Sequence, residues 1–341
     1  MKEENMKMEN IVPENIRPDI VGAGISVTGS AHDERVGRRK LEHLIREISE
    51  RDIEILKSTR AYRYLTTSQI RRLHFLDAAS DTAALRSANR ILVKLKGLDL
   101  LRPLNRRIGG VRAGSGSFVW ALSPIGARLL AMAECADNPT RKRFHEPSPS
   151  FLEHTLAVAE LSIRLLEMGF AGKTAALVKQ ELEPGCWRNY TNMGGAAKTL
   201  KPDLFAVTSS GEYEDNWFFE VDLATESPVQ VIRKCEQYMA YRRSGVEQRR
   251  DGVFPSVVWL VPTEKRKASL MRHIADMERG QDSRSNGIAE IFTVIVMDEL
   301  YSLIELGAEE FKKLGVSMEK AQTDGNSVEN GVKNPLIQRR G

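Results

Sequence analysis

Residues 66 to 122 carry the pattern that most restricts how this chain can fold. Thr66 or its neighbour can cap a short helix, and after a break the apolar spacing predicts a second helix over residues 82–96. Gly97 ends that helix, and two short strands are expected over residues 98–103 and 117–122. Two short helices followed by two short strands form a small unit that must bury one face of the second helix.

The other face of the second predicted helix is basic. Its apolar positions keep a spacing of three to four residues, whereas Arg86, Arg90 and Lys94 recur every four residues on the opposite side, with Asn89 beside them. A longer amphipathic stretch, from Arg38 to about Thr59, precedes both of these helices. Helix, helix, basic helix and β-ribbon is the order of a winged helix-turn-helix, which we assign to residues 35–132.

The charge distribution supports a polyanion as the partner of this region. Between Arg35 and Arg112 there are 19 Lys/Arg against 8 Asp/Glu, whereas the whole chain has a net charge of only +4. Duplex DNA is the partner we predict, because basic clustering on such a module is its electrostatic footprint. A solvated helix face, or a winged helix that binds protein, would carry the same pattern. The residues expected to contact DNA are Arg86, Asn89, Arg90, Lys94, Arg106, Arg107 and Arg112.

Composition shifts divide the rest of the chain. We expect a disordered arm over residues 1–34, a linker over 133–150, a second domain over 151–306 and a mostly disordered tail over 307–341. No apolar run approaches the roughly 18 residues that a membrane span needs. The three cysteines are scattered and form no disulfide framework, which predicts a reducing cytoplasm and no contact with membranes.

The second domain carries acidic side chains at the ends of its predicted strands. In the strand 217–223 the alternation of side chains places Glu220 and Asp222 on one face. Asp203 begins the preceding strand, and Glu181 closes the one before it. Two acids in an otherwise apolar strand are costly unless a metal ion or another cation neutralises them.

These acids, with the order helix, three strands, helix and strand around them, resemble the PD-(D/E)XK nuclease fold. The resemblance implies a mixed-sheet α/β domain after the winged helix, α+β overall, in which Asp203 and Glu220 bind Mg²⁺ and Glu181 is a further acid. The position of the usual lysine holds Asp222 instead. Lys234, on the following helix, can supply the missing ammonium group. An active metal site and a structural ion-pair network both agree with this set of residues.

The whole arrangement is similar to the replication-relaxation family of plasmid and mobile-element proteins, over about residues 50 to 300. The resemblance implies a role in plasmid replication or in DNA relaxation during mobilisation, with replication or relaxosome proteins as further partners. The motifs that carry it are Leu65-Thr66-x-x-Gln69-Ile70, Leu122-Ser123-Pro124-Ile125-Gly126, His154-Thr155-Leu156-Ala157-Val158, Glu183-Pro184-x-x-Trp187-Arg188, Lys201-Pro202-Asp203 and Phe219-Glu220-Val221-Asp222-x-x-Thr225-Glu226-Ser227.

Three functions follow from these observations. The first is a non-catalytic DNA-binding factor that positions replication or mobilisation machinery. The second is a Mg²⁺-dependent endonuclease that nicks DNA through Asp203, Glu220 and Lys234 and is targeted by its winged helix. The third is a transcription regulator whose α/β domain senses a ligand or a partner.

Overall fold

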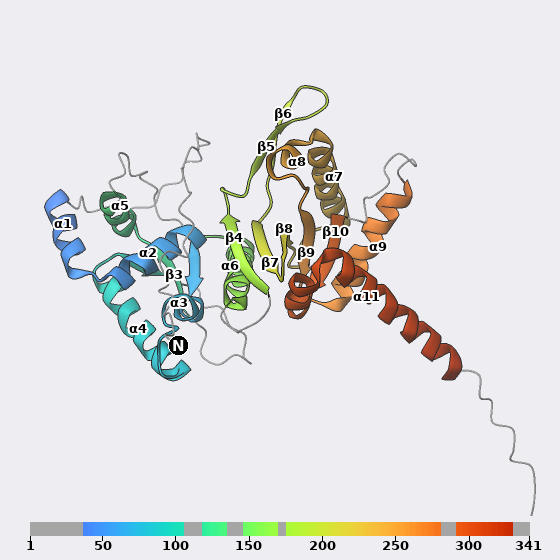
Figure 1. Ribbon diagram of the computed structural model, residues 1–341. Coiled ribbons are helices and arrows are strands. Elements are labelled where there is room, and N and C mark those ends of the chain that lie inside the picture. The colour runs from blue at the N-terminus through green and yellow to red at the C-terminus, as the bar shows by residue number, and fades with distance from the viewer. Residues whose placement is uncertain (1–36, 106–117, 135–145, 170–174, 281–290, 330–341) are drawn as a thin grey trace, which may run out of the picture. The chain divides into compact units, whose positions relative to one another are not determined.

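The computed structural model describes residues 37–105, 118–134, 146–169, 175–280 and 291–329 (Figure 1). The chain divides into two compact units. The first comprises the N-terminal part to Glu167 together with residues 179–187, and the second comprises residues 168–178 and everything after Trp187. The expected N-terminal arm and the tip between the two short strands lie outside the described residues.

The first unit contains the predicted order of helices and β-ribbon. Three strands form one sheet in the order β1-β3-β2, and both neighbouring pairs are antiparallel. The long stretch predicted as one helix is two helices, because the Ser49 hydroxyl and the Asp52 carboxylate form a capping box that starts a new helix. The elements are α1 (Arg38–Glu47), α2 (Glu50–Tyr62), β1 (Tyr64–Thr66), α3 (Thr67–His74), α4 (Asp81–Gly97), β2 (Leu101–Pro103), β3 (Val119–Leu122), α5 (Pro124–Ala133) and α6 (Pro149–Met168).

Local signals fix the start of α3 and α4. Thr66 caps α3, accepting a hydrogen bond from the Gln69 backbone N–H, while the Gln69 side chain accepts one in return from the Thr66 N–H. Ser80 caps α4 in the same way through the Ala83 N–H. The helix-turn-helix therefore follows from short-range hydrogen bonding, and the turn between its helices spans residues 75–80.

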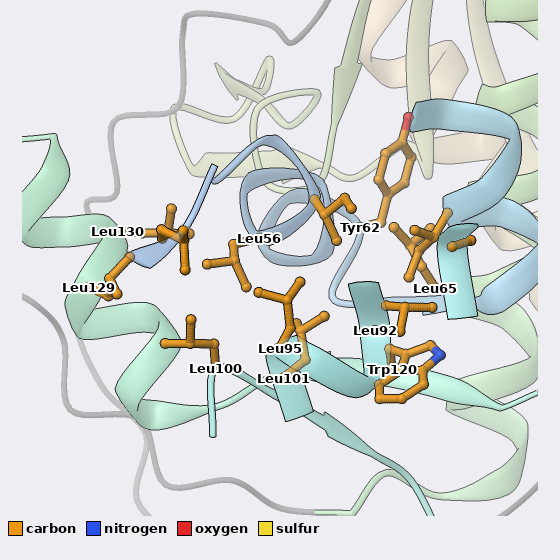
Figure 2. Close-up of a cluster of buried hydrophobic side chains, with 14 of the residues drawn as sticks. Leu56, Tyr62, Leu65, Leu92, Leu95, Leu100, Leu101, Trp120, Leu129 and Leu130 are labelled. Carbon is orange, nitrogen blue, oxygen red and sulfur yellow. The ribbon is translucent and has the colours of Figure 1, made fainter. Parts of the chain in front are cut away.

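The core of the first unit gathers around the inner face of α4 (Figure 2). Ala84, Ala88, Leu92 and Leu95 are buried on that face, and Figure 2 shows Leu92 and Leu95 among side chains from α2, the strands and α5. The apolar spacing expected for this helix includes Leu85, but Leu85 is 42% exposed and Ala84 is buried in its place. The other three buried positions follow the expected spacing.

Helix α6 belongs to the first unit, although we expected it to begin the second domain. The Tyr62 and Ser162 hydroxyls lie 2.8 Å apart, and the Gln69 amide donates to the Leu156 carbonyl oxygen at 3.1 Å. Arg72 of α3 also binds two glutamates of α6, Glu160 and Glu167, through contacts of 2.6 to 2.8 Å. Hydrogen bonds and ion pairs thus fasten α6 to the helix-turn-helix.

The second unit is built on a mixed five-stranded sheet in the order β10-β9-β8-β7-β4. Strands β7 and β8 are antiparallel, whereas β8, β9 and β10 run parallel to one another. Strand β4 (Ala175–Leu182) divides between the two units. The other elements are β5 (Arg188–Thr191), β6 (Ala197–Leu200), β7 (Leu204–Ser210), β8 (Tyr213–Val221), α7 (Pro228–Ser244), α8 (Val246–Asp251), β9 (Ser256–Val261), α9 (Glu264–Gly280), β10 (Phe292–Val296), η2 (Met297–Glu299) and α11 (Leu300–Glu329).

Two features of the second unit differ from the sequence prediction. Residues 188–200 form an additional hairpin of β5 and β6, which runs outward from the five-stranded sheet in Figure 1. The tail predicted to be mostly disordered from residue 307 continues as helix α11 to Glu329, with a break in helical geometry at Gly307. Residues 330–341 lie outside the described part of the chain.

Candidate functional site

The outer face of α4 carries the DNA-binding residues predicted on this helix. Arg86, Asn89 and Arg90 are all exposed, opposite the buried Ala88 and Leu92. Two apolar side chains share the exposed side, since Leu85 is 42% and Val93 is 67% exposed. Neither was expected from the sequence to lie at the surface. The face therefore offers guanidinium and amide donors together with apolar side chains that can contact a thymine methyl group.

Lys94 has a structural partner. Its ammonium group lies 2.7 Å from the carboxylate of Asp52, which is buried in the first unit, and 3.2 Å from the Glu47 carbonyl oxygen. A buried carboxylate requires such a cation, so Lys94 stabilises the contact between α2 and α4. Arg106, Arg107 and Arg112, predicted to extend the DNA contact, lie outside the described residues.

The second unit brings three of the predicted acidic residues to one region. Asp203 immediately precedes β7, and its backbone N–H donates to the Phe219 carbonyl oxygen at 3.1 Å. One carboxylate oxygen of Asp203 accepts a hydrogen bond of 2.7 Å from the backbone N–H of Val221. Asp203, Glu220 and Asp222 are all buried, with 7%, 1% and 1% exposure. The antiparallel pairing of β7 with β8 thus sets Asp203 beside the end of β8.

Glu220 is held by two residues of α7. The Tyr238 hydroxyl donates to one carboxylate oxygen at 2.5 Å, and the Lys234 ammonium pairs with the other oxygen. Burial raises the pKa of Glu220 to about 8, Lys234 acts against this rise, and the nearby Asp203 adds to it. Burial alone would lower the pKa of Lys234, but these two carboxylates together raise it above its ordinary value. The predicted convergence of Lys234 on Glu220 is therefore present as a direct contact between a partly exposed ammonium group and a buried carboxyl group.

Asp222, which stands in the position of the usual nuclease lysine, is neutralised by a residue that the sequence analysis did not identify. Arg266 of α9 approaches one oxygen of Asp222 at 2.6 Å and also donates to the Glu226 carbonyl oxygen at 2.7 Å. The other oxygen of Asp222 accepts from the backbone N–H of Ala224 at 2.8 Å, where the backbone adopts a positive φ of 62°. Asp222 and Arg266 together hold the turn between β8 and α7.

Glu181 is part of the first unit, within the end of β4. Its carboxylate pairs with Lys179 at 2.7 Å, and both side chains are partly exposed. Glu181 thus has a neutralising partner two residues away on the same strand.

The acidic cluster of the second unit does not fit the Mg²⁺ site that the nuclease resemblance implies. Magnesium needs oxygen ligands in near-ideal octahedral geometry. Both oxygens of Glu220 are engaged by side chains, and one oxygen of Asp203 is engaged by a backbone N–H. Among the described residues, no group of three or more His, Cys, Asp and Glu side chains is placed to hold a metal ion. The cluster is a set of carboxylates each matched to a protein donor.

Comparison with protein families assigns the greater part of the chain to one family. The family model described as replication-relaxation matches residues 56–257, which is more than half of the chain. The chain belongs to the replication-relaxation family. The matched region runs from α2 to the start of β9, and so it includes the helix-turn-helix, the acidic residues and α7.

Several residues that carried the predicted resemblance to the replication-relaxation family have clear structural roles. Thr66 and Gln69 form the capping box of α3, and Ser227 forms another with Gln230 at the start of α7. At Gly126 an added Cβ would lie 2.2 Å from the Leu100 carbonyl oxygen, so this position excludes any side chain. These motif residues define helix ends and close packing.

Other comparisons add little to this family assignment. A comparison with curated proteins finds no match. Among solved structures the chain is similar to restriction endonuclease FokI at 13% identity, over 83% of this chain and 75% of that chain, with a TM-score of 0.22. A score that low supports no inference about fold or activity. No helix in the described ranges is long and apolar enough to cross a membrane.

Proposed function

We propose that this replication-relaxation protein binds duplex DNA through the outer face of α4, within a winged helix formed by α2, β1, α3, α4, β2 and β3. The observation that carries the proposal is the division of α4 into two faces. Ala88 and Leu92 are fully buried, whereas Arg86, Asn89 and Arg90 point outward on a helix whose position is fixed by its core. A helix with one anchored face can enter the major groove and present the other to base edges.

The chemistry of the exposed residues suggests how that face reads DNA. Arginine donates two hydrogen bonds to guanine O6 and N7, and asparagine pairs with adenine in a similar way. Arg86 and Arg90 are therefore assigned to guanine edges or phosphates, and Asn89 to an adenine. Leu85 and Val93 flank Asn89 at a spacing of four residues, where they can contact thymine methyl groups. We infer a recognition site that contains A·T as well as G·C pairs.

The biological role follows from the family. Replication and relaxation are processes that act on DNA, and a protein of this kind requires a way to locate its site. In our proposal the chain is a DNA-binding factor of a plasmid or mobile element that positions the replication or mobilisation machinery. The contacts of Glu220 with Lys234 and Tyr238, and the ion pair of Asp222 with Arg266, favour a structural acidic cluster over a Mg²⁺-dependent nuclease site.

DNA binding is tested with the double variant Arg86→Ala/Arg90→Ala in the full-length protein. Its matched control is Arg39→Ala/Arg46→Ala, which removes two exposed cations from α1 of the same unit. Selection of bound sequences from a random duplex pool supplies the cognate site, and fluorescence anisotropy then measures affinity against salt concentration. We expect the α4 variant to lose most of its sequence preference and to show a flatter salt dependence, while the control keeps its preference. Equal preference in both variants would rule out α4 as the recognition helix.

The nuclease alternative is tested on the same cognate DNA. Supercoiled plasmid is incubated with the protein and Mg²⁺ or Mn²⁺, and nicking is followed on gels. We expect no nicking above background. Nicking that disappears in Asp203→Asn and Glu220→Gln, with DNA affinity unchanged, would establish the endonuclease instead.

A further inference from the structure

Strands β5 and β6 form a separate two-stranded sheet. Such a hairpin is only marginally stable unless it packs on something else. Its outward face is polar: Asn189, Thr191, Ala197 and Thr199 are all exposed, and they occupy directly opposed positions in the two strands. The opposite face supplies the apolar contacts, since Tyr190 and Leu200 are buried.

Its base is nevertheless anchored firmly. Arg188 pairs with Glu247 of α8 at 3.3 Å, and both side chains are almost fully buried. The Arg188 guanidinium lies 4.7 Å from the ring centre of Phe205, and Tyr190 packs edge-on against Tyr241 of α7 at 5.2 Å. Buried ion pairs contribute little net stability but fix one geometry. The hairpin is thus held in a defined position on the end of α7 and on α8.

The tip of the hairpin is also ordered by its own hydrogen bonds. The Asn192 side chain accepts from the backbone N–H groups of Gly194 and Ala196, at 3.1 and 2.9 Å. Gly195 has a positive φ of 78°, which permits the tight turn. Met193 stands at this tip with 92% exposure. An ordered tip loses little conformational freedom when it meets a partner.

Basic residues predominate around the base of the hairpin. Residues 188–201 and 242–251 contain seven Lys/Arg and two Asp/Glu, and the hairpin segment contains no acid. The rest of the second unit has 15 Lys/Arg and 21 Asp/Glu, so a basic surface lies on an acidic body. Of the two acids, Glu247 is buried against Arg188, and Asp251 pairs with Arg250 at 2.8 Å. The exposed or partly exposed cations of this surface are Lys198, Lys201, Arg242, Arg243, Arg249 and Arg250.

We propose that the β5–β6 hairpin, with the end of α7 and with α8, forms a second DNA-binding surface, which takes the sugar–phosphate backbone of duplex DNA. Below it is called the hairpin surface. A two-stranded ribbon fits a DNA groove, and cations at its base can then reach the flanking phosphates. The short side chains of the outward face permit close approach, and the exposed methionine is of the apolar type that such ribbons place against bases. The proposal rests on DNA being the partner of the chain, and it adds a contact independent of α4.

The test uses full-length protein in the Arg86→Ala/Arg90→Ala background, so that α4 no longer dominates binding. The hairpin variant adds Lys198→Ala, Arg243→Ala and Arg249→Ala. The matched control adds Lys265→Ala, Arg272→Ala and Arg279→Ala, which remove three exposed cations from α9 of the same unit. Anisotropy of a labelled random duplex of about 30 base pairs is measured from low to moderate salt. Thermal unfolding verifies that each variant is folded.

We expect the hairpin variant to bind about tenfold more weakly at low salt, and its slope of log affinity against log salt to fall by about 2 to 3. The control should change both quantities by much less. Equal slopes in the two variants would overturn the proposal, and so would a preference of tenfold or more for duplex RNA of the same length. Should the triple change unfold the protein, Lys198→Glu alone, on the exposed part of the hairpin, must still reduce the slope.

The two DNA proposals fail in different ways. If the hairpin surface is wrong, the α4 variants still lose sequence preference while the hairpin variant behaves as its control. If α4 is wrong, the α4 variants keep their preference. A hairpin variant with a reduced slope then still supports the second surface.

Discussion

Removing the Arg266 guanidinium is the sharpest test of whether Asp222 is structural. The Asp222 side chain is fully buried, and Arg266, which pairs with it, is only 14% exposed. Arg266→Met keeps the apolar stem of the side chain but leaves the Asp222 carboxylate without a cation. It also removes the donor of the 2.7 Å hydrogen bond to the Glu226 carbonyl oxygen.

The expected loss can be estimated from these contacts. Breaking a buried pair by removing one partner costs about 3–5 kcal/mol. Asp222 keeps its hydrogen bond from the Ala224 backbone, which places the loss toward the lower end, and the lost bond to Glu226 adds about 1 kcal/mol. We therefore expect Arg266→Met to lower the free energy of unfolding of the second unit by about 4 kcal/mol. The double variant Asp222→Asn/Arg266→Met should lose less than the sum of the single changes, with a coupling of about 1–3 kcal/mol.

The assay is urea unfolding followed by the fluorescence of Trp217 and Trp259, which are buried in the sheet of the second unit. Lys265→Met is the matched control, because Lys265 is the exposed neighbour of Arg266 on the same helix. The control should change stability by less than about 0.5 kcal/mol. If Arg266→Met lowers the free energy of unfolding no more than Lys265→Met does, the buried Asp222 does not depend on this cation. The structural interpretation of the cluster is then refuted.

Two further predictions concern one residue in each unit. The pKa of Glu220 is raised in the folded state to about 8, so its contribution to stability is full below about pH 4.5 and is lost as the pH rises to about 8. The side chain in Glu220→Gln does not titrate. In urea titrations the free energy of unfolding of the wild type, relative to this variant, should therefore fall between pH 5 and 8. Parallel pH profiles for the two proteins would contradict this. Gly126→Ala should destabilise the first unit by about 1–3 kcal/mol in thermal unfolding, because its Cβ would meet the Leu100 carbonyl oxygen at 2.2 Å. Gly97→Ala, where an added Cβ meets nothing within 4 Å, should be neutral or stabilising by up to about 1 kcal/mol.

Helix starts were predictable from the sequence because their determinants are local. Thr66, one of the two predicted caps, begins α3, since its hydroxyl needs only a backbone N–H three residues ahead. Which face of a helix is buried is harder to predict from the sequence. Along α4 the apolar spacing located the buried Ala88, Leu92 and Leu95, but it also included Leu85, which is exposed.

Long-range partners were not predictable in the same way. Arg266 lies 44 residues beyond Asp222, and nothing near either residue indicates the pair. The Arg72 contacts to Glu160 and Glu167 likewise span about 90 residues, which is why the sequence placed α6 in the wrong unit. The hairpin of β5 and β6 escaped prediction because its polar outward face lacks the apolar alternation of a buried strand.

The charge pairs of the second unit connect its sheet to two helices. The carboxylates of Glu220 and Asp222 each meet a cation on a helix packed against the sheet, Lys234 and Arg266 respectively. In a metal site these carboxylates would have to remain available to the ion. Here each contacts a basic side chain of α7 or α9 instead. The basic hairpin surface lies at the far end of the same α7, which Lys234 helps to fix. The acidic cluster thus supports the helix against which the hairpin packs, and in our proposal the DNA contact of this unit lies outside that cluster.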